Sequence, residues 1–375
     1  MPRSTLARAA RLAGPRRSAL LWAATALIVL ATPAALALGY YAVRKLSFPY
    51  EFCGAYGELD GELGWRLKPG ARSCLRGRNR WTGESYFDST IVVDLDGFRS
   101  ADPAGRAARG GIVAIGDSWT FGYGLDLEGS YPHALSQLVE APVANMAVPA
   151  YGSAQVLLWL ERRVAELAPR AVVYLTLGLW QRSLCGEDDA VVLLAPCFRP
   201  EPVSGRITLV TPEPGRVLGM ATRGIYPGGY LTAGVDSWSY FLISRPVLVA
   251  RAALARLGRR LGFGPTGAER ESARGAVLAF ELERHLALAR RHGYVVVLLD
   301  PQGDYRDAVA ALAAPETDLV AYVSPERWSA EVSVPSAALP PAEQRVPQDG
   351  HFGPGANRLI AALVARVLAE AGVAP

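Results

Sequence analysis

The feature that most constrains the fold of this chain is a short apolar run that ends in a tight polar turn. Residues 111–115 read Gly-Ile-Val-Ala-Ile, a composition typical of a buried parallel strand, and Gly116, Asp117 and Ser118 follow directly. Open α/β sheets bind their ligands at the carboxyl ends of such strands. Because Gly116 permits a sharp bend, Ser118 is expected to present its hydroxyl just beyond it. Ser118 is therefore a candidate nucleophile, with an ordinary Gly-Asp-Ser turn as the alternative.

A second polar group stands near the C-terminus, where Asp349, Gly350 and His351 precede an alanine-rich helical pattern over residues 358–371. This places a carboxylate and an imidazole on one loop. Serine hydrolysis needs a base to take the hydroxyl proton and an acid to hold the imidazolium, and their order along the chain varies between folds. We therefore predict Ser118 as nucleophile, His351 as general base and Asp349 as its orienting partner.

Between these two stretches, helical and strand patterns alternate. Helices are predicted over 131–140, 154–167 and 269–292, and strands over 143–146, 171–177, 294–299 and 318–323. Such alternation favours a parallel sheet of about five strands with right-handed crossovers. Residues 185–240, rich in proline and glycine, interrupt the alternation and are predicted to be an insertion that overhangs the site. His285 and His292 lie seven residues apart on the long helix, and we expect both to face solvent.

The nucleophile stretch and the C-terminal loop together resemble the first and last sequence blocks of the SGNH (GDSL-like) hydrolases, a family of serine esterases and acyltransferases. Residues 145–155 resemble the second block, and residues 172–182 lie where the third is expected. In many members the acid lies three residues before the histidine, where this chain has Gln348, whereas Asp349 has the shorter spacing of some branches. The resemblance covers residues 111–375 and implies a three-layer α/β/α fold of the flavodoxin-like kind with a central parallel sheet. Its serine chemistry needs no metal and no cofactor, and none is predicted.

The resemblance also implies an oxyanion hole with three donors. The first is the Ser118 N–H, and Ala150 or Gly152 would supply a second backbone N–H. The third donor of the family is an asparagine side chain, which is missing here. Gln181 carries the same amide one methylene further out, whereas Trp180 could donate only through its indole. Loss of one such donor typically costs about 2.7–4 kcal/mol of transition-state stabilisation, so the departure predicts slow or restricted activity.

The N-terminal segment predicts membrane insertion or export. Residues 1–17 hold five arginines and no acidic residue, and residues 18–43 contain no charged residue. This second stretch exceeds the roughly 20 residues that cross a bilayer as a helix, and the arginines before it favour a cytoplasmic N-terminus. We predict a cytoplasmic basic tail (1–17), a transmembrane anchor (18–43) and a body outside the cytoplasm. The alternative is a signal peptide cleaved near Ala35, Leu36 and Ala37.

The predicted extracytoplasmic body carries almost no net charge. Without the five N-terminal arginines, 34 basic residues stand against 35 acidic ones, which argues against a nucleic-acid partner. Within this body, residues 44–110 are predicted to form an N-terminal extension and residues 111–375 the hydrolase-like domain.

The four cysteines fall as two local pairs, Cys53 with Cys74 and Cys185 with Cys197. In an oxidising compartment each pair could close a short loop and stabilise the fold by about 3 kcal/mol, although three connectivities are possible. Zinc binding is the competing interpretation, but no Cys-x-x-Cys motif supports it.

Two tryptophans near the predicted site favour a carbohydrate substrate. Trp119 follows the nucleophile and Trp180 lies in the third block, and such rings offer a sugar a flat apolar face and an N–H, with core packing as the alternative. Exported proteins that resemble this family often act on O-acetyl groups of envelope polysaccharides. We therefore expect an esterase or O-acyltransferase for short acyl esters of extracytoplasmic carbohydrate, attached to the membrane by its N-terminal helix. The alternatives are a lipid esterase and a non-catalytic binding or scaffold protein of the cell envelope.

Overall fold

The computed structural model describes residues 50–79, 82–185, 195–201, 206–211, 267–312 and 318–373, together with Trp22, Thr25, Ala31, Thr32 and Gly39. Most of the predicted anchor (18–43) and most of the predicted insertion (185–240) lie outside these residues. Within the described parts of the chain, no helix combines the length and the apolar character needed to span a bilayer. Residues Tyr50–Gly77 and Ser85–Pro375 form one compact unit, and Met1–Pro49 with Arg78–Glu84 form a second.

A five-stranded sheet is the centre of the larger unit, and its strands lie in the order β12-β11-β8-β6-β7. These strands are β6 (Ile112–Ile115), β7 (Val143–Asn145), β8 (Ala171–Leu175), β11 (Val295–Leu299) and β12 (Val320–Val323). All four neighbouring pairs are parallel, which confirms the predicted parallel sheet. Numbered along the chain, the five strands have the order 2-1-3-4-5, the flavodoxin-like arrangement, in which the strand order reverses between β6 and β8.

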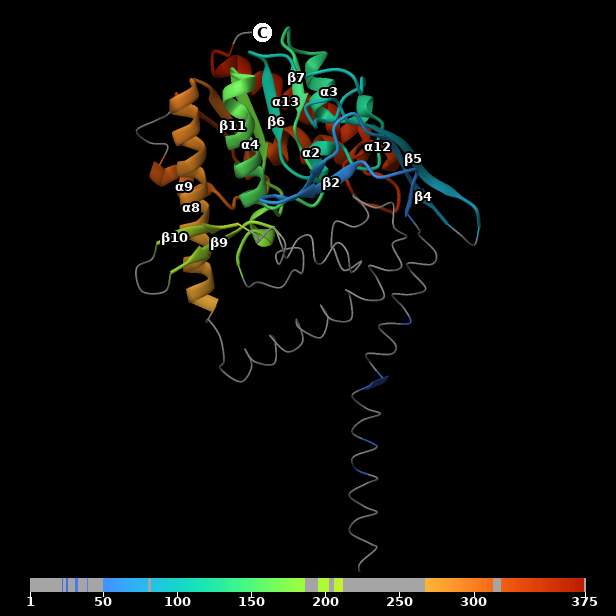
Figure 1. The fold of residues 1–375 in the computed structure, drawn as a ribbon, viewed down its shortest axis with the longest axis horizontal. Helices are drawn as coiled ribbons and strands as arrows, with labels where there is room; N and C mark the ends of the chain where they lie inside the picture. Colours follow the sequence, from blue (N-terminus) through green and yellow to red (C-terminus); the bar gives the residue numbers. More distant parts are fainter. Residues whose placement is uncertain are drawn as a thin grey trace, which may run out of the picture. The chain divides into compact units, whose positions relative to one another are not determined.

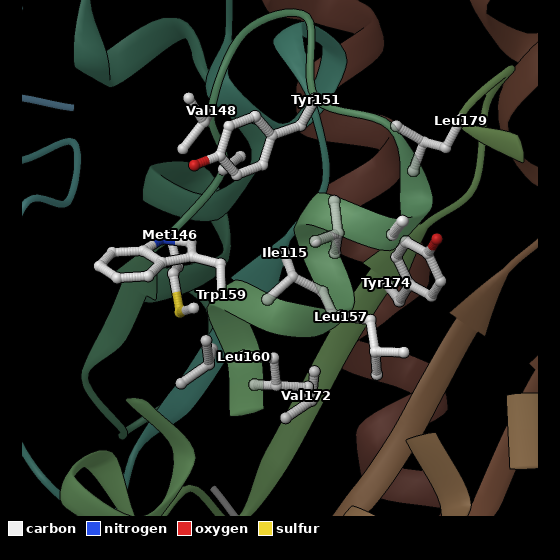
Figure 2. Close-up of a cluster of buried hydrophobic side chains, with 14 of the residues drawn as sticks. Ile115, Met146, Val148, Tyr151, Leu157, Trp159, Leu160, Val172, Tyr174 and Leu179 are labelled. Carbon is white, nitrogen blue, oxygen red and sulfur yellow. The ribbon is translucent and has the colours of Figure 1, made fainter. Parts of the chain in front are cut away.

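Helices cover both faces of this sheet, giving the predicted three layers (Figure 1). Helices α4 (Ser153–Leu167) and α8 (Gly267–His292) bury apolar side chains against one face, and α3 (Tyr131–Ser136) and α13 (Pro354–Glu370) against the other. Alternate residues of each strand point to opposite faces, so nearly every residue of β6 and β8 is apolar and buried. Figure 2 shows one face of this core, where Ile115 and Val172 of the sheet meet Leu157 and Leu160 of α4.

The segment before β6 forms small antiparallel sheets. Its strands are β1 (Tyr50–Phe52), β2 (Gly57–Asp60), β3 (Gly64–Leu67), β4 (Arg72–Arg78) and β5 (Ser85–Val92), which pair as β1-β4-β5 and β2-β3. This segment packs on the loop after β7: the Trp65 indole donates to the Pro149 carbonyl at 3.3 Å, and the Tyr151 hydroxyl donates to the Trp65 carbonyl at 2.6 Å. Trp65 is fully buried, so its ring contributes to the core.

The remaining elements are short, and several of them line the path from β12 to α13. They are α2 (Ser118–Phe121), η1 (Leu127–Gly129), η2 (Trp180–Arg182), β9 (Cys197–Pro200), β10 (Ile207–Val210), α9 (Arg306–Leu312), α10 (Pro325–Trp328), η3 (Ser329–Ser333), α11 (Val334–Ala337) and α12 (Pro341–Gln344).

Both disulfides join the local cysteine pairs, which selects one of the three possible connectivities. Cys53 bonds to Cys74 across a Cα–Cα distance of 4.9 Å, and Cys185 bonds to Cys197 across 5.1 Å. The second disulfide ties the end of the loop after β8 to β9. At this point the chain enters the region predicted as an insertion.

Candidate active site

The predicted nucleophile lies where the sequence pattern places it, at the carboxyl end of β6. Gly116 has a φ of +150°, and a Cβ at this position would lie 2.5 Å from the Thr120 hydroxyl, so a larger residue would disrupt the turn. Helix α2 begins at Ser118, and the Asp117 carboxylate caps it by accepting the Trp119 N–H at 3.1 Å. These local contacts position the Ser118 side chain beside the point where the strand order reverses.

Two buried side chains hold the far end of α2, and neither was among the predicted site residues. Arg99 donates through Nη1 to the carbonyls of Phe121 and Gly122 at 2.6 and 2.7 Å, and it is 3% exposed. Burial lowers the pKa of Arg99 to about 10, which still leaves it charged at neutral pH. The Asn145 amide donates to the Phe121 carbonyl at 3.3 Å. Arg99 comes from the segment before β6, so that segment helps to shape the nucleophile helix.

The structure brings Ser118, His351 and Asp349 together across 233 residues of sequence. The Ser118 hydroxyl lies 2.8 Å from His351 Nε2, within hydrogen-bond reach, and His351 Nδ1 contacts the Asp349 carboxylate. The Asp349 side chain is 5% exposed and the His351 side chain 20% exposed, so the imidazole alone of this pair is open to solvent. With Nδ1 facing Asp349, Nε2 is left to accept the proton of the Ser118 hydroxyl.

The histidine loop is held by backbone pairing and by the start of α13. The Val346 N–H donates to the His351 carbonyl at 2.8 Å, and Arg345 forms an antiparallel bridge with Phe352. Asn357, which is buried in α13, donates through its amide to the Phe352 carbonyl at 3.1 Å. The position of the imidazole is therefore set by contacts on both sides of the loop.

Aromatic rings flank the imidazole. The ring centroids of Trp119 and His351 are 4.6 Å apart, and those of Tyr123 and His351 are 5.2 Å apart. Trp119 is half-buried, which leaves part of its surface available to a ligand. Tyr123 was not among the predicted site residues, although it follows the nucleophile by only five positions.

The two backbone N–H groups predicted as the second oxyanion donor differ in whether they already have an acceptor. The Gly152 N–H already donates to the Gln155 side chain at 2.9 Å, because Gln155 caps the start of α4. Of the two alternatives predicted for the second donor, Gly152 is therefore the one whose N–H is already engaged. The Ala150 N–H has no acceptor among the described residues, and Ala150 adopts a left-handed φ of +66°. Of the two backbone candidates, Ala150 is the one whose N–H is available.

The residues predicted to replace the missing asparagine do not contact the nucleophile turn. Gln181 is exposed, and no contact between its amide and α2 is present in the described part of the chain. Trp180 packs against the core, with the Arg274 guanidinium 4.8 Å from its ring centroid. Instead, the next residue of this loop reaches the turn: Arg182 Nη2 contacts the Asp117 carboxylate, which is almost fully buried. This contact from the loop to the turn is therefore made by a guanidinium and not by an amide.

A second carboxylate and imidazole lie together on α8, beneath the opposite face of the sheet from α13. The prediction that His285 faces solvent is wrong: His285 is 1% exposed and Glu281 is fully buried, with 3.9 Å between His285 Nε2 and Glu281 Oε1. The Tyr174 hydroxyl donates to Glu281 at 2.7 Å. Burial raises the pKa of Glu281 to about 7 and lowers the pKa of His285 to about 3, so burial favours the neutral form of each.

No protein-family model matches this chain, and neither does any curated protein sequence. Among solved structures, the chain is similar to a protein described as lipolytic and of the G-D-S-L family from Desulfitobacterium hafniense DCB-2, with 13% identity over 68% of this chain and 98% of the other and a TM-score of 0.34. It is also similar to TesA, with 16% identity over 69% and 98% of the two chains and a TM-score of 0.36. The α/β hydrolase LAE5 from the metagenome of Lake Arreo, Spain, is 13% identical over 71% and 96%, with a TM-score of 0.33. Likenesses at this level assign no activity to the chain.

Proposed function

We propose that this chain is a serine hydrolase of the SGNH (GDSL-like) kind that acts on short acyl esters of carbohydrate through an acyl-serine intermediate. The observation that supports the proposal best is the contact chain from the Ser118 hydroxyl through the His351 imidazole to the Asp349 carboxylate. A nucleophile, a base and an orienting acid in hydrogen-bond reach are what acyl transfer to and from serine needs.

In the proposed reaction, the Ser118 oxygen attacks the carbonyl carbon of the ester while His351 Nε2 takes the hydroxyl proton. Asp349 stabilises the imidazolium that forms. The tetrahedral oxyanion accepts hydrogen bonds from the Ser118 N–H and the Ala150 N–H. Collapse of this intermediate breaks the bond to the alcohol, which leaves with the proton from His351, and the acyl group stays on Ser118. Water or a sugar hydroxyl then attacks the acyl-serine by the same steps, which makes the protein an esterase or an O-acyltransferase.

The Arg182–Asp117 ion pair gives the site an electrostatic feature of its own. A buried carboxylate beside the nucleophile would disfavour negative charge on the oxyanion, because Coulomb repulsion is weakly screened in a low dielectric. The Arg182 guanidinium offsets that charge through its contact with Asp117. In the proposed mechanism it therefore keeps the Asp117 charge from opposing the oxyanion.

The predicted substrate and location agree with two observations. The half-buried Trp119 ring next to the imidazole offers an apolar face on which a sugar can stack. Two disulfides are typical of proteins in an oxidising compartment, in keeping with a body outside the cytoplasm behind the predicted anchor at residues 18–43.

A non-catalytic binding protein is the second candidate function. The occupied Gly152 N–H and the exposed Gln181 both favour it, because together they leave the site with fewer oxyanion donors than the family arrangement implies.

Labelling with a fluorophosphonate probe separates these two functions, because the probe bonds only to an activated serine. We expect the full-length protein to be labelled, Ser118→Ala to be unlabelled, and Ser333→Ala, which changes an exposed serine on η3, to be labelled like the wild type. Labelling that survives Ser118→Ala, or is absent from the wild type, would favour the binding protein.

A second experiment identifies the acyl acceptor. The full-length wild-type protein is given 4-nitrophenyl acetate with and without oligosaccharides, and the products are analysed by mass spectrometry. Acetylated sugar selects the transferase and free acetate alone selects the esterase. A preference for long acyl chains presented in vesicles would select a lipid esterase instead.

A further inference from the structure

Arg345 lies beside the histidine loop and takes no part in the steps proposed so far. Its backbone pairs with Phe352 in an antiparallel bridge, one residue beyond His351. The neighbouring Val346 N–H donates to the His351 carbonyl at 2.8 Å, so the segment that carries Arg345 is joined directly to the loop that carries the imidazole. Any movement of one strand of this pair would disturb the other.

Two aromatic rings orient the Arg345 side chain. Its guanidinium carbon lies 4.8 Å from the centroid of the Phe352 ring and 5.5 Å from that of Trp119. Trp119 is the same ring that packs on the imidazole, with 4.6 Å between centroids. The guanidinium is therefore separated from the reacting groups by one side chain.

The stacked guanidinium keeps most of its donors. Nη1 donates to the Gly350 carbonyl at 3.0 Å, and the guanidinium makes no other hydrogen bond to the described residues. Rings that pack on the face of a guanidinium leave its edge open, so the Nε and Nη2 N–H groups can still donate side by side. That edge matches the two oxygens of a carboxylate in spacing and in plane.

No carboxylate in the described part of the chain pairs with Arg345. The two nearest in sequence are engaged elsewhere: Glu343 contacts Arg358 at 2.8 Å, and Asp349 contacts His351. Partial burial lowers the pKa of Arg345, with no acidic neighbour acting in the opposite direction. Other surface arginines of this chain do pair, as Arg327 does with Glu370 at 2.7 Å.

We propose that Arg345 binds a carboxylate on the substrate, so that the preferred ester is carried by an acidic sugar such as a uronic acid. The inference rests on the proposed function, because it assigns the substrate class of the same site. A cation held on rings beside the catalytic imidazole, with its donor edge free, is suited to anchor a uronate while the adjacent acyl ester reaches Ser118.

A matched pair of sugars tests the proposal: methyl glucuronoside and methyl glucoside, each acetylated at the same hydroxyl, differ only in the carboxylate at C6. For the full-length protein we expect kcat/KM to be about tenfold higher for the glucuronoside, as befits a hydrogen-bonded charge pair. Arg345→Gln should bring the ratio close to one, and Arg345→Lys should keep part of it, since a point charge remains without the fork. Arg109→Gln removes the same charge near the opposite end of β6 and should leave the ratio unchanged.

The outcomes distinguish failure of the inference from failure of the function. If 4-nitrophenyl acetate is hydrolysed but the two sugars react equally, or if the preference survives in Arg345→Gln, the inference is wrong and the function stands. If the wild type turns over neither the aryl ester nor the sugars and does not react with the fluorophosphonate, both are wrong. Raising the salt concentration should lower the wild-type ratio, because it screens a partly exposed charge pair.

Discussion

The described part of the chain contains two carboxylate–imidazole pairs that differ in their burial and in their hydrogen-bond partners. At Asp349 and His351 both ring nitrogens have partners, and the imidazole is 20% exposed at the carboxyl edge of the sheet. At Glu281 and His285 the two groups lie beneath the sheet, 3.9 Å apart, and neither ring nitrogen has a hydrogen-bond partner among the described residues.

This difference shows what a histidine needs in order to move protons. The edge pair can hold an imidazolium, because a carboxylate contacts one nitrogen and a hydroxyl lies at the other. In the buried pair, desolvation dominates: it raises the pKa of the acid and lowers the pKa of the base, so charge separation is disfavoured. The edge pair is suited to catalysis, whereas the buried pair affects stability.

The largest expected effect comes from removing each imidazole in turn. His351→Gln should lower kcat for 4-nitrophenyl acetate by about four orders of magnitude or more, because Ser118 loses its base. His285→Gln should change kcat by less than about threefold, since it lies outside the proposed reaction. Steady-state kinetics on the two variants, with thermal melts to verify folding, makes the comparison. Similar losses in both would contradict the distinction between the pairs.

Removing the charge of each carboxylate should likewise lower kcat at the edge pair and not at the buried pair. Asp349→Asn keeps the size of the side chain but no longer stabilises an imidazolium, and we expect kcat to fall by about 10³- to 10⁴-fold. Glu281→Gln, at pH 6, should leave kcat within about twofold, because it replaces a protonated acid by a neutral amide. A pH–rate profile for each variant is the measurement. A wild-type rate in Asp349→Asn would remove Asp349 from the mechanism.

Stability should depend on pH through the buried acid. The pKa of Glu281 is about 7 in the folded protein against an ordinary value of 4.5, so the folded state keeps a proton that the unfolded state releases between these pH values. The contribution of Glu281 to the free energy of unfolding therefore falls as pH rises from 4.5 to 7 and changes no further above 7. Glu281→Gln removes this dependence. As pH rises from 4.5 to 7, the free energy of unfolding of the variant minus that of the wild type should therefore increase by about 3 kcal/mol.

Denaturant titrations of both proteins at several pH values measure this difference. Contributions shared by the two proteins cancel, including that of His285, whose lowered pKa acts in the opposite sense as pH falls below 6.5. A relative stability that stays constant from pH 4.5 to 7 would show that Glu281 titrates normally in the folded state.

The smallest expected effect concerns the hydrogen bond that Tyr174 donates to Glu281 at 2.7 Å. Tyr174→Phe should lower the free energy of unfolding by about 1–2 kcal/mol at pH 6, because it leaves a buried carboxyl oxygen without that donor. Tyr322→Phe, which removes a 3.0 Å bond from a half-buried hydroxyl to Asp300, serves as the control and should cost less. Both acceptors are fully buried and only the Tyr322 hydroxyl is half-buried, so equal costs would mean that burial of the donor has little influence.

Much of the fold and of the candidate triad could be predicted, since the signals for both are local. A five-residue apolar run predicts a buried strand wherever that strand ends up, and Gly116 predicts the turn after it because the required φ is +150°. The motif Asp349-Gly350-His351 places acid and base two residues apart, so one loop carries both. That the loop would meet Ser118 was predicted from the base and acid that a serine nucleophile needs, together with the resemblance to a family.

What the sequence did not predict is the orientation of individual N–H groups and side chains, because contacts with distant residues set it. Gly152 lies in the predicted loop, yet its N–H is taken by Gln155 once α4 forms. Gln181 has the right chemistry, yet its side chain is exposed. Arg99 was not predicted to contribute to the site, and only packing of the segment before β6 turns its guanidinium onto the carbonyls after Ser118.

The sequence by itself determined which chemical groups the chain can offer and which segments are strands, helices and turns, because periodicity and glycine act over a few residues. Only the tertiary structure decided what surrounds each histidine, and therefore how readily it takes a proton. His285 and His351 each follow a carboxylate by a few positions, and both could have been catalytic or structural on that evidence. The two histidines differ because distant segments pack around them differently. These segments set the burial and the hydrogen-bond partners of each ring, and both set the free energy of a charged imidazole.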